Sequence, residues 1–351
     1  MFPIIPANSA TAASGNDEGI FRGGYITLNM TNLVSNAGVV ASDVAGVGTG
    51  RYDQGGTQYG GDKGIFGFGN NNGSNTGVQS MTNLVSNTGV VSSDVAGVGT
   101  ARNSCGATQY GTDTAIFAFG SPIGPGALTN VSNLVSNTGV VASDQAATTG
   151  TSRSYIAACE YGGDKGIFCY GSGGGYWSVA NLVSNAGVVS SDVAVVGTAR
   201  SALSACSYGG DKGIFGYGYT HPTTHSLTNL VSNVGVVASD VAGVGTARSG
   251  LAACEYGDDK GIFGFGYTGS VSSLSNLVSN AGVVATDVTG VGTARYALAA
   301  CEYGTDTAIF GFGTTGSVTA VTNLVSNAGV VASDVTGVGT ARQGLAACSF
   351  K

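Results

Sequence analysis

Charged side chains are scarce in this sequence. Asp, Glu, Lys and Arg make up 9% of the 351 residues, whereas about a quarter is usual for a soluble domain. The 13 Lys and Arg are outnumbered by 20 Asp and Glu, the formal net charge is −7, and no basic cluster occurs. Binding to nucleic acid or to an anionic membrane surface needs such a cluster. Neither is therefore an expected partner.

Long apolar runs are also missing. No stretch approaches the roughly 18 uninterrupted apolar residues that a membrane-spanning helix needs. The first ten residues contain neither the basic segment nor the apolar core of a signal peptide. We therefore predict no membrane insertion and no signal peptide, and the location of the protein stays open.

Proline is rare and glycine is abundant, with 5 and 61 residues respectively. The glycines do not follow a three-residue period, which excludes a collagen helix. Apolar residues alternate regularly along the chain, and disordered segments lack such a pattern. The sequence therefore predicts a folded, turn-rich protein.

One phrase recurs along the chain. It consists of an Arg, a strand of small residues, a Gly/Asp turn and an apolar strand that ends in glycine, as in residues 245–266. Repeat units bury their apolar faces only against their neighbours, so one architecture should cover nearly the whole chain. The segment Asn-Leu-Val-Ser-Asn follows the phrase seven times, starting at Asn32, Asn83, Asn133, Asn181, Asn229, Asn276 and Asn323.

The repeat is split between the two ends of the chain. Residues 16–21 match the second half of the phrase, and residues 342–351 stop after its first half. Two halves that sum to one unit are what a closed ring needs, and closure removes exposed strand edges. We therefore predict an all-β, seven-bladed β-propeller at residues 16–351, preceded by an arm at residues 1–15. Pairing of the C-terminal inner strand with the N-terminal outer strands would close the ring.

Each repeat of about 48 residues has room for four short strands. The fourth is expected in the Val-Val-Ala-Ser-Asp-Val segment, after an Asn-Ala-Gly or Asn-Thr-Gly hairpin turn that needs a positive φ. In the second strand, alternation predicts Phe263 and Phe265 on one face. Gly264 between them should leave room for the neighbouring blade.

The sequence resembles the kelch repeat of β-propellers. Arg248, the small residues 251–253, the apolar segment 262–266 and the following Asn-Leu-Val-Ser-Asn carry the resemblance, which extends over residues 16–351. Two features differ, because the family's double glycine is Gly-Phe-Gly here and its fourth-strand Trp is absent. The Gly- and Asn-rich, nearly identical repeats also resemble those of bacteriophage tail and virion-surface proteins. That resemblance implies a place on a virion or particle surface.

Most charges recur once in every repeat, whereas a single catalytic site needs its residues only once. We therefore predict that the repeat Arg forms a bidentate bond with an Asp of the same or the adjacent blade. The alternative is a ring of carboxylates that grips cations or a symmetric partner. The residues concerned are Arg51, Arg102, Arg153, Arg200, Arg248, Arg295, Arg342, Asp43, Asp94, Asp144, Asp192, Asp240, Asp287 and Asp334.

No catalytic or metal-binding constellation is recognised. Five of the seven Cys occupy one position of the first strand, where two other repeats have Thr57 and Thr108. Equivalent positions on different blades are hard to bring within disulfide range, so we predict reduced structural thiols. His221 and His225 have the H-x₃-H spacing of half a zinc site, but no Cys or acidic residue lies nearby in the sequence. We predict no enzyme activity, cofactor or metal.

The repeats differ most between the second and third strands. An up-and-down strand order puts these loops and the connections between blades on one face, and the near-constant turns on the other. Binding residues usually lie on loops of a rigid scaffold, and Tyr, Trp, Asn and Ser resemble an adaptable paratope. The alternative is that these loops are simply unconstrained. Candidate ligand-binding residues are Asn71, Tyr176, Trp177, Tyr219, His221, His225 and Tyr267.

These observations predict a non-enzymatic binding and display module, plausibly on a virion or appendage surface. It would recognise a glycan or a protein partner through the face that carries the divergent loops. The alternative is a structural assembly protein that docks into a larger symmetric particle through the constant face or through the arm at residues 1–15.

Overall fold

The computed structural model describes residues 17–25, 28–44, 46–74, 76–123, 126–145, 150–194 and 197–350. These residues form β-strands, turns and loops, so the prediction of an all-β protein is confirmed. The arm predicted at residues 1–15 lies outside the described residues.

Seven antiparallel sheets repeat the same strand order. Their inner strands are β3 (Gly55–Tyr59), β6 (Gly106–Tyr110), β9 (Ala157–Tyr161), β13 (Ser204–Tyr208), β18 (Ala252–Tyr256), β21 (Ala299–Tyr303) and β24 (Ala346–Phe350). Their middle strands are β1 (Glu18–Arg22), β4 (Lys63–Gly67), β7 (Thr114–Gly120), β10 (Lys165–Cys169), β14 (Lys212–Gly216), β19 (Lys260–Tyr267) and β22 (Thr307–Gly311).

The third strand of each sheet contains the Asn-Leu-Val motif. These strands are β2 (Thr31–Val34), β5 (Thr82–Val85), β8 (Thr129–Val135), β11 (Val179–Val183), β17 (Thr228–Val231), β20 (Val271–Val278) and β23 (Thr322–Val325). Three two-residue strands complete the set: β12 (Val193–Ala194) pairs with β11, and β15 (Tyr219–Thr220) pairs with β16 (Thr223–Thr224).

The two ends of the chain share one sheet, in the order β2-β1-β24. Ile20 of β1 lies opposite Cys348 of β24 in an antiparallel pairing. The two half-repeats predicted this pairing, which the sheet order confirms.

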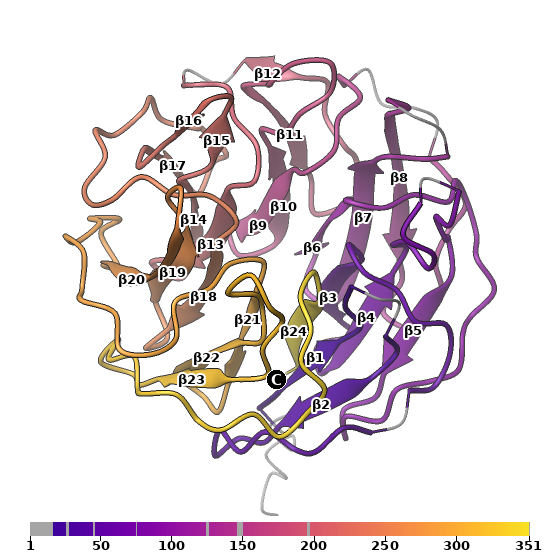
Figure 1. Ribbon diagram of the computed structural model, residues 1–351. Coiled ribbons are helices and arrows are strands. Elements are labelled where there is room, and N and C mark those ends of the chain that lie inside the picture. Colours follow the sequence, from indigo (N-terminus) through magenta and orange to yellow (C-terminus); the bar gives the residue numbers. More distant parts are fainter. Residues whose placement is uncertain are drawn as a thin grey trace, which may run out of the picture.

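Inner strands of successive sheets lie side by side. β3 contacts β6, β6 contacts β9, and the series continues through β13, β18 and β21 to β24, which contacts β3. In Figure 1 the sheets surround a common centre, and the inner strands lie nearest to it.

Backbone hydrogen bonds join neighbouring sheets at both ends of the inner strands. After the inner strand, the amide of Gly60 donates to the carbonyl of Asp113, and the equivalent amide of Gly304 donates to Asp17. Before the inner strand, the amide of Asp53 donates to the carbonyl of Gly344. The bonds to Asp17 and Gly344 connect repeats from opposite ends of the chain.

Two faces are distinguished by their hydrogen bonds. On the first, which we call the turn face, the Asn of the hairpin after the third strand donates to the Asp of the turn after the inner strand, as from Asn137 to Asp113. On the second, the loop face, the connection between repeats forms a β-bridge with the loop after the middle strand, as between Ser154 and Ser172. The near-constant turns and the divergent loops thus lie on opposite faces, as predicted.

The prediction of four strands in each repeat is wrong for most sheets. The outer segment forms only isolated bridges, for example Val34 to Val40 and Thr31 to Val44. Val34 lies three positions after Thr31, whereas Val44 lies four positions after Val40. The outer segment therefore contains one extra residue, as in a β-bulge. The side-chain amide of Asn32 donates to the Ala41 carbonyl and to Asp43, and these bonds replace ladder contacts.

Phe263 and Phe265 do not share one face. Phe265 has a φ of +63° beside a register shift in β19, a conformation that bulky residues rarely adopt. Phe263 packs on Tyr217 of the preceding repeat, whereas Phe265 packs on Phe310 of the next. The prediction from regular strand alternation is therefore wrong for Phe265.

Gly264 leaves room for the neighbouring sheet, as predicted. A Cβ at this position would lie 2.6 Å from Cζ of Phe310. The ring centroids of Phe265 and Phe310 are 5.3 Å apart. Where Ala118 or Cys169 replaces the glycine, the equivalent rings are 5.7 and 5.9 Å apart. The size of this one side chain thus sets the spacing of two aromatic rings.

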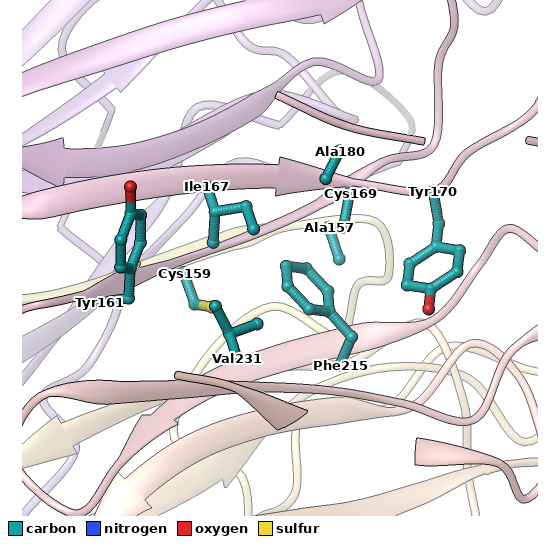
Figure 2. Close-up of a cluster of buried hydrophobic side chains, with 9 residues drawn as sticks. All are labelled: Ala157, Cys159, Tyr161, Ile167, Cys169, Tyr170, Ala180, Phe215 and Val231. Carbon is teal, nitrogen blue, oxygen red and sulfur yellow. The ribbon is translucent and has the colours of Figure 1, made fainter. Parts of the chain in front are cut away.

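The core lies between neighbouring sheets rather than within one. Figure 2 shows Cys159 of β9 beside Val231 of β17, and Phe215 of β14 near Tyr170. All seven cysteines are free, and six are buried. The prediction that they carry no disulfide is therefore confirmed.

Candidate functional site

The repeat Arg links two sheets and is fully buried. In Arg248, Nε donates to the carbonyl of Phe265 at 2.8 Å and Nη2 donates to Oδ1 of Asn276 at 2.6 Å. Its guanidinium lies 4.1 Å from the ring centroid of Tyr217 in the preceding repeat. The predicted bidentate bond to Asp is absent here, because only Nη1 approaches Asp287, at 3.8 Å. Asn276, which the sequence analysis did not assign, is the closer partner.

The repeat Asp is occupied by neutral donors. Asp94 accepts hydrogen bonds from the amide and hydroxyl of Thr49 and from the side-chain amide of Asn83. Burial raises the pKa of Asp94, but these bonds and the charge of Arg51 outweigh burial and hold the pKa below its usual range. Equivalent Thr and Asn side chains donate hydrogen bonds to the other six repeat Asp residues, Asp43, Asp144, Asp192, Asp240, Asp287 and Asp334. The carboxylates of the repeat Asp residues are therefore engaged in hydrogen bonds within and between the sheets.

One sheet departs from the pattern. Arg22 stands at the position of Gly264, and Gly23 replaces the aromatic residue that follows it. Arg22 is fully buried and donates from Nη1 to Oε1 of Gln54, whose side-chain amide donates back to the Arg22 carbonyl. Burial, together with the charge of Arg51, lowers the pKa of Arg22 to about 9. In this sheet, the hydrogen-bonded pair of Arg22 and Gln54 stands in place of the aromatic side chain that Gly23 lacks.

A cavity of about 430 Å³ lies between the inner strands, and all seven of them line it. Nε2 of Gln109 donates to Oε1 of Glu160 at 2.8 Å. Within the described ranges, no group of three or more His, Cys, Asp or Glu side chains is arranged to hold a metal ion. The polar lining of the cavity includes the turn residues Asp211 and Lys212 and the inner-strand residues Gln58, Gln109, Glu160, Ser207, Glu255, Glu302 and Ser349.

On the loop face, three of the candidate residues come together. The rings of Tyr176 and Tyr219 are 6.4 Å apart at 83°, and those of Tyr219 and His221 are 6.1 Å apart. The Tyr219 hydroxyl hydrogen-bonds Nδ1 of His221 at 2.7 Å. Tyr176 and Tyr219 come from different repeats, so neighbouring loops assemble this aromatic cluster.

A surface depression of about 460 Å³ lies beside Tyr176. The loops after β7 and β10 form it together with the connection before β9. Ser121, Ser154 and Ser172 provide hydroxyl groups, and Gly173 to Gly175 leave the backbone accessible. None of the described residues that line the depression is charged.

Trp177 is half-buried and stabilises its own loop. Its indole Nε1 donates to the carbonyl of Gly173 at 3.3 Å, and its amide donates to Gly171. The side chain of Leu128 packs so close to Gly173 that a Cβ there would lie 2.3 Å from it. Trp177 therefore shapes the loop that borders the depression.

The remaining candidates lie apart from this cluster. His225 is half-buried, and burial followed by the charge of Arg200 lowers its pKa. Asn71 lies in the loop after β4, where its amide donates to Gly77. Tyr267 packs on Tyr296, at a centroid distance of 5.4 Å.

A third tyrosine pair, Tyr25 and Tyr52, is not among the candidate binding residues drawn from the sequence. Tyr25 occupies the repeat position of Tyr267, and that correspondence was the signal available in the sequence.

Within the described residues, the structure contains no helix that is long and apolar enough to cross a membrane. Comparison of the chain with protein-family models and with curated proteins finds no match.

Proposed function

We propose that the chain forms a closed, kelch-like, seven-bladed β-propeller. The contacts that run from β3 through each inner strand to β24 and back to β3 support this ring. The bonds from Asp53 to Gly344 and from Gly304 to Asp17 support closure at both ends of the inner strands. The sheet shared by β1 and β24 would be the blade that closes the ring.

We further propose that this scaffold is a non-enzymatic binding and display module for a glycan. The observation that carries the proposal is the uncharged depression beside Tyr176, with its hydroxyls and open glycine backbone. A sugar presents apolar C–H faces and many hydroxyls. It is suited to a site that combines an aromatic ring with neutral hydrogen-bonding groups. A place on a virion or appendage surface is proposed from the resemblance of the repeats alone.

Tyr219 would extend the same surface. Its ring is held edge-on to Tyr176 and its hydroxyl is fixed by His221. Aromatic side chains with few rotatable bonds lose little conformational entropy when they contact a ligand. The two rings, one beside the depression and one fixed next to it, could therefore contact successive units of a glycan chain.

A glycan array with the full chain tests this proposal. We expect one family of neutral glycans to bind and Tyr176→Ala to weaken binding by about fivefold or more, since a lost aromatic stack is worth roughly 1 kcal/mol or more. Trp177→Ala should weaken binding as well, because it releases the Gly173 loop. Tyr296→Ala, on the same face but outside the depression, is the control. No bound glycan, or equal binding by Tyr176→Ala, would sink the proposal.

The second candidate function is structural assembly, which a feature of the turn face favours. Each repeat exposes the Val that follows its hairpin glycine, with 63–66% of the side chain accessible in the seven repeats. Repeated exposed apolar groups often mark contact surfaces. Light scattering of the full chain and of a variant lacking residues 1–15 tests this function. A strictly monomeric protein that is indifferent to the deletion would count against it.

A further inference from the structure

Two tyrosine pairs occupy equivalent positions on the loop face. Tyr25 and Tyr52 have ring centroids 5.2 Å apart, and Tyr267 and Tyr296 have centroids 5.4 Å apart. Tyr267 is the last residue of its middle strand and Tyr25 lies three residues after the end of its own. The other ring of each pair follows the repeat Arg of the next sheet. The pairs differ at the next residue, which is Asp53 in the first and Ala297 in the second.

The backbone holds Asp53 firmly. Its amide donates to the carbonyl of Gly344 at 3.1 Å, and its own carbonyl accepts from the amide of Ser104 at 2.9 Å. Its φ is +50°, and the φ angles of all seven equivalent positions lie between +50° and +64°. The position of the carboxylate is therefore set by the connections between sheets and not by the local loop.

The Asp53 side chain is half-buried without a counter-charge. In the described part of the chain, its carboxylate has no hydrogen bond or ion pair with another side chain. Gly344 lies opposite, and a Cβ there would be 3.4 Å from Oδ1 of Asp53. Burial raises the pKa of Asp53 to about 6. Charges withdrawn from water usually have a partner of opposite sign, and none of the described side chains forms an ion pair with Asp53.

Aromatic rings gather near this carboxylate. The Tyr25 ring packs on Tyr52, which directly precedes Asp53. The amide of Ser104 donates to the Asp53 carbonyl and the amide of Tyr155 donates to the Ser104 carbonyl, so Tyr155 lies on the same face of the inner strands. Burial raises the pKa of Tyr52, and the charges of Asp53, Tyr25 and Tyr155 raise it further. Tyr25 and Tyr155 are 46% and 54% exposed, so both rings are accessible to a ligand. The faces of phenol rings attract cations, most strongly when the cation is poorly hydrated.

We propose that Tyr25, Tyr52, Asp53 and Tyr155 form a binding site for an organic cation with a methylated ammonium group. The rings would contact the methyl groups, and the carboxylate would supply the opposite charge. A neutral ligand would leave the carboxylate without a counter-charge, so the cluster favours a cation over a sugar. This site is separate from the depression beside Tyr176 and does not rest on the function proposed there.

Titration of the full chain with choline tests the proposal, with tyrosine ring resonances as the readout. We expect the Tyr25 and Tyr52 signals to shift and the Tyr267 and Tyr296 signals to stay. The neutral isostere 3,3-dimethyl-1-butanol should bind at least about tenfold more weakly, since it lacks the charge that both the rings and the carboxylate recognise. Equal binding of the two compounds would overturn the proposal, as would shifts that favour the second tyrosine pair.

Two substitutions separate charge from folding. Asp53→Asn removes the charge but keeps a residue that tolerates positive φ, and it should weaken choline binding by at least about tenfold. Ala297→Asp places a carboxylate beside the Tyr267–Tyr296 pair and should create a second set of shifting signals. Unchanged choline affinity in Asp53→Asn would overturn the proposal. An Ala297→Asp variant with no second site would overturn the role assigned to the carboxylate and tyrosine pair.

Discussion

Arg248 and Tyr155 represent two parts of the molecule with different relations to their neighbours. Arg248, between two sheets, is fully buried and meets a carbonyl, an amide, a carboxylate and an aromatic ring. Tyr155, on the loop face, is 54% exposed, and its amide donates to Ser104. The Arg248 side chain makes all these contacts within the fold, whereas the Tyr155 side chain is accessible to a ligand.

The difference lies in how polar groups are satisfied. Between the sheets, the repeat Arg, Asn, Asp and Thr satisfy one another, so their removal should cost stability. On the loop face, the backbone alone fixes Asp53, Ser104 and Tyr155, so their side chains can change without unfolding the protein. Stability and binding should therefore respond to different substitutions.

The largest effect is expected from Arg248→Met, which tests the framework side of this comparison. The substitution leaves the Phe265 carbonyl and the Asn276 side chain without their donor in a buried site. Loss of one partner of a buried ionic network costs roughly 3–5 kcal/mol, measurable as the free energy of unfolding in urea. Lys260→Ala is the control, because its ion pair with Asp259 is solvent-exposed and should contribute below about 1 kcal/mol. Similar losses in both variants would contradict the comparison.

Asp53→Asn should raise the free energy of unfolding, whereas Arg248→Met lowers it. The reason is that the ionised Asp53 on the loop face destabilises the folded state. Its pKa of about 6 lies above the unfolded value of about 3.9, so the ionised form is disfavoured in the folded state. The penalty is absent below about pH 4, grows between pH 4 and 6, and is complete above pH 6. The variant should be more stable at pH 7 by roughly 1–3 kcal/mol and equal at pH 4.

Asp94→Asn is the matched control for that titration. The pKa of Asp94 lies below its usual range, so its ionised form stabilises the fold at neutral pH. The variant should be less stable at pH 7, and the deficit should shrink as the pH falls through the folded pKa. Urea unfolding of both variants from pH 3 to 7 gives the two slopes, and slopes of the same sign would break the comparison.

A smaller loss is expected from Gly264→Ala. The new methyl group must push Phe310 away, as Ala118 does to the equivalent ring, where the centroid distance is 5.7 Å instead of 5.3 Å. Because a natural repeat already accommodates this change, the cost should be about 1 kcal/mol, at the low end for overpacking. A loss above about 3 kcal/mol would mean that the sheets cannot adjust their spacing.

The smallest effect is expected from Cys254→Thr. Two repeats carry Thr57 and Thr108 at this position, and the thiol forms no disulfide. The free energy of unfolding should change by less than about 1 kcal/mol, and reductant should not alter it in either protein. Dependence on reductant would show that the thiol has a role beyond filling space.

Much of the framework could be predicted from the sequence, because repetition reveals it. The split phrase at the two ends predicted the pairing of β1 with β24, and Gly264 was correctly assigned to close packing between sheets. Phe265 could not be placed, because its positive φ contradicts what a bulky residue prefers. The bulge in the outer segment was missed for a related reason, since the bonds of Asn32 to Ala41 and Asp43 are not visible in strand propensity.

The loop face was less predictable. Sequence divergence singled out this face, and three of the residues named from it, Tyr176, Tyr219 and His221, come together there. It could not reveal that Trp177 is committed to Gly173, or that Tyr25 and Tyr52 meet across two repeats. Such contacts depend on which loops the neighbouring sheets bring together, and this information is absent from any single repeat.

The central claim is that the two ends of the chain complete one sheet and so close the ring that carries the loops. Ile20→Cys tests this most directly, because Ile20 lies opposite the native Cys348. After mild oxidation, peptide mass spectrometry should find a link between positions 20 and 348 within one chain. Ile262→Cys, opposite Cys254 within one repeat, shows that the chemistry works. A link in the control without any link between positions 20 and 348 would contradict the account.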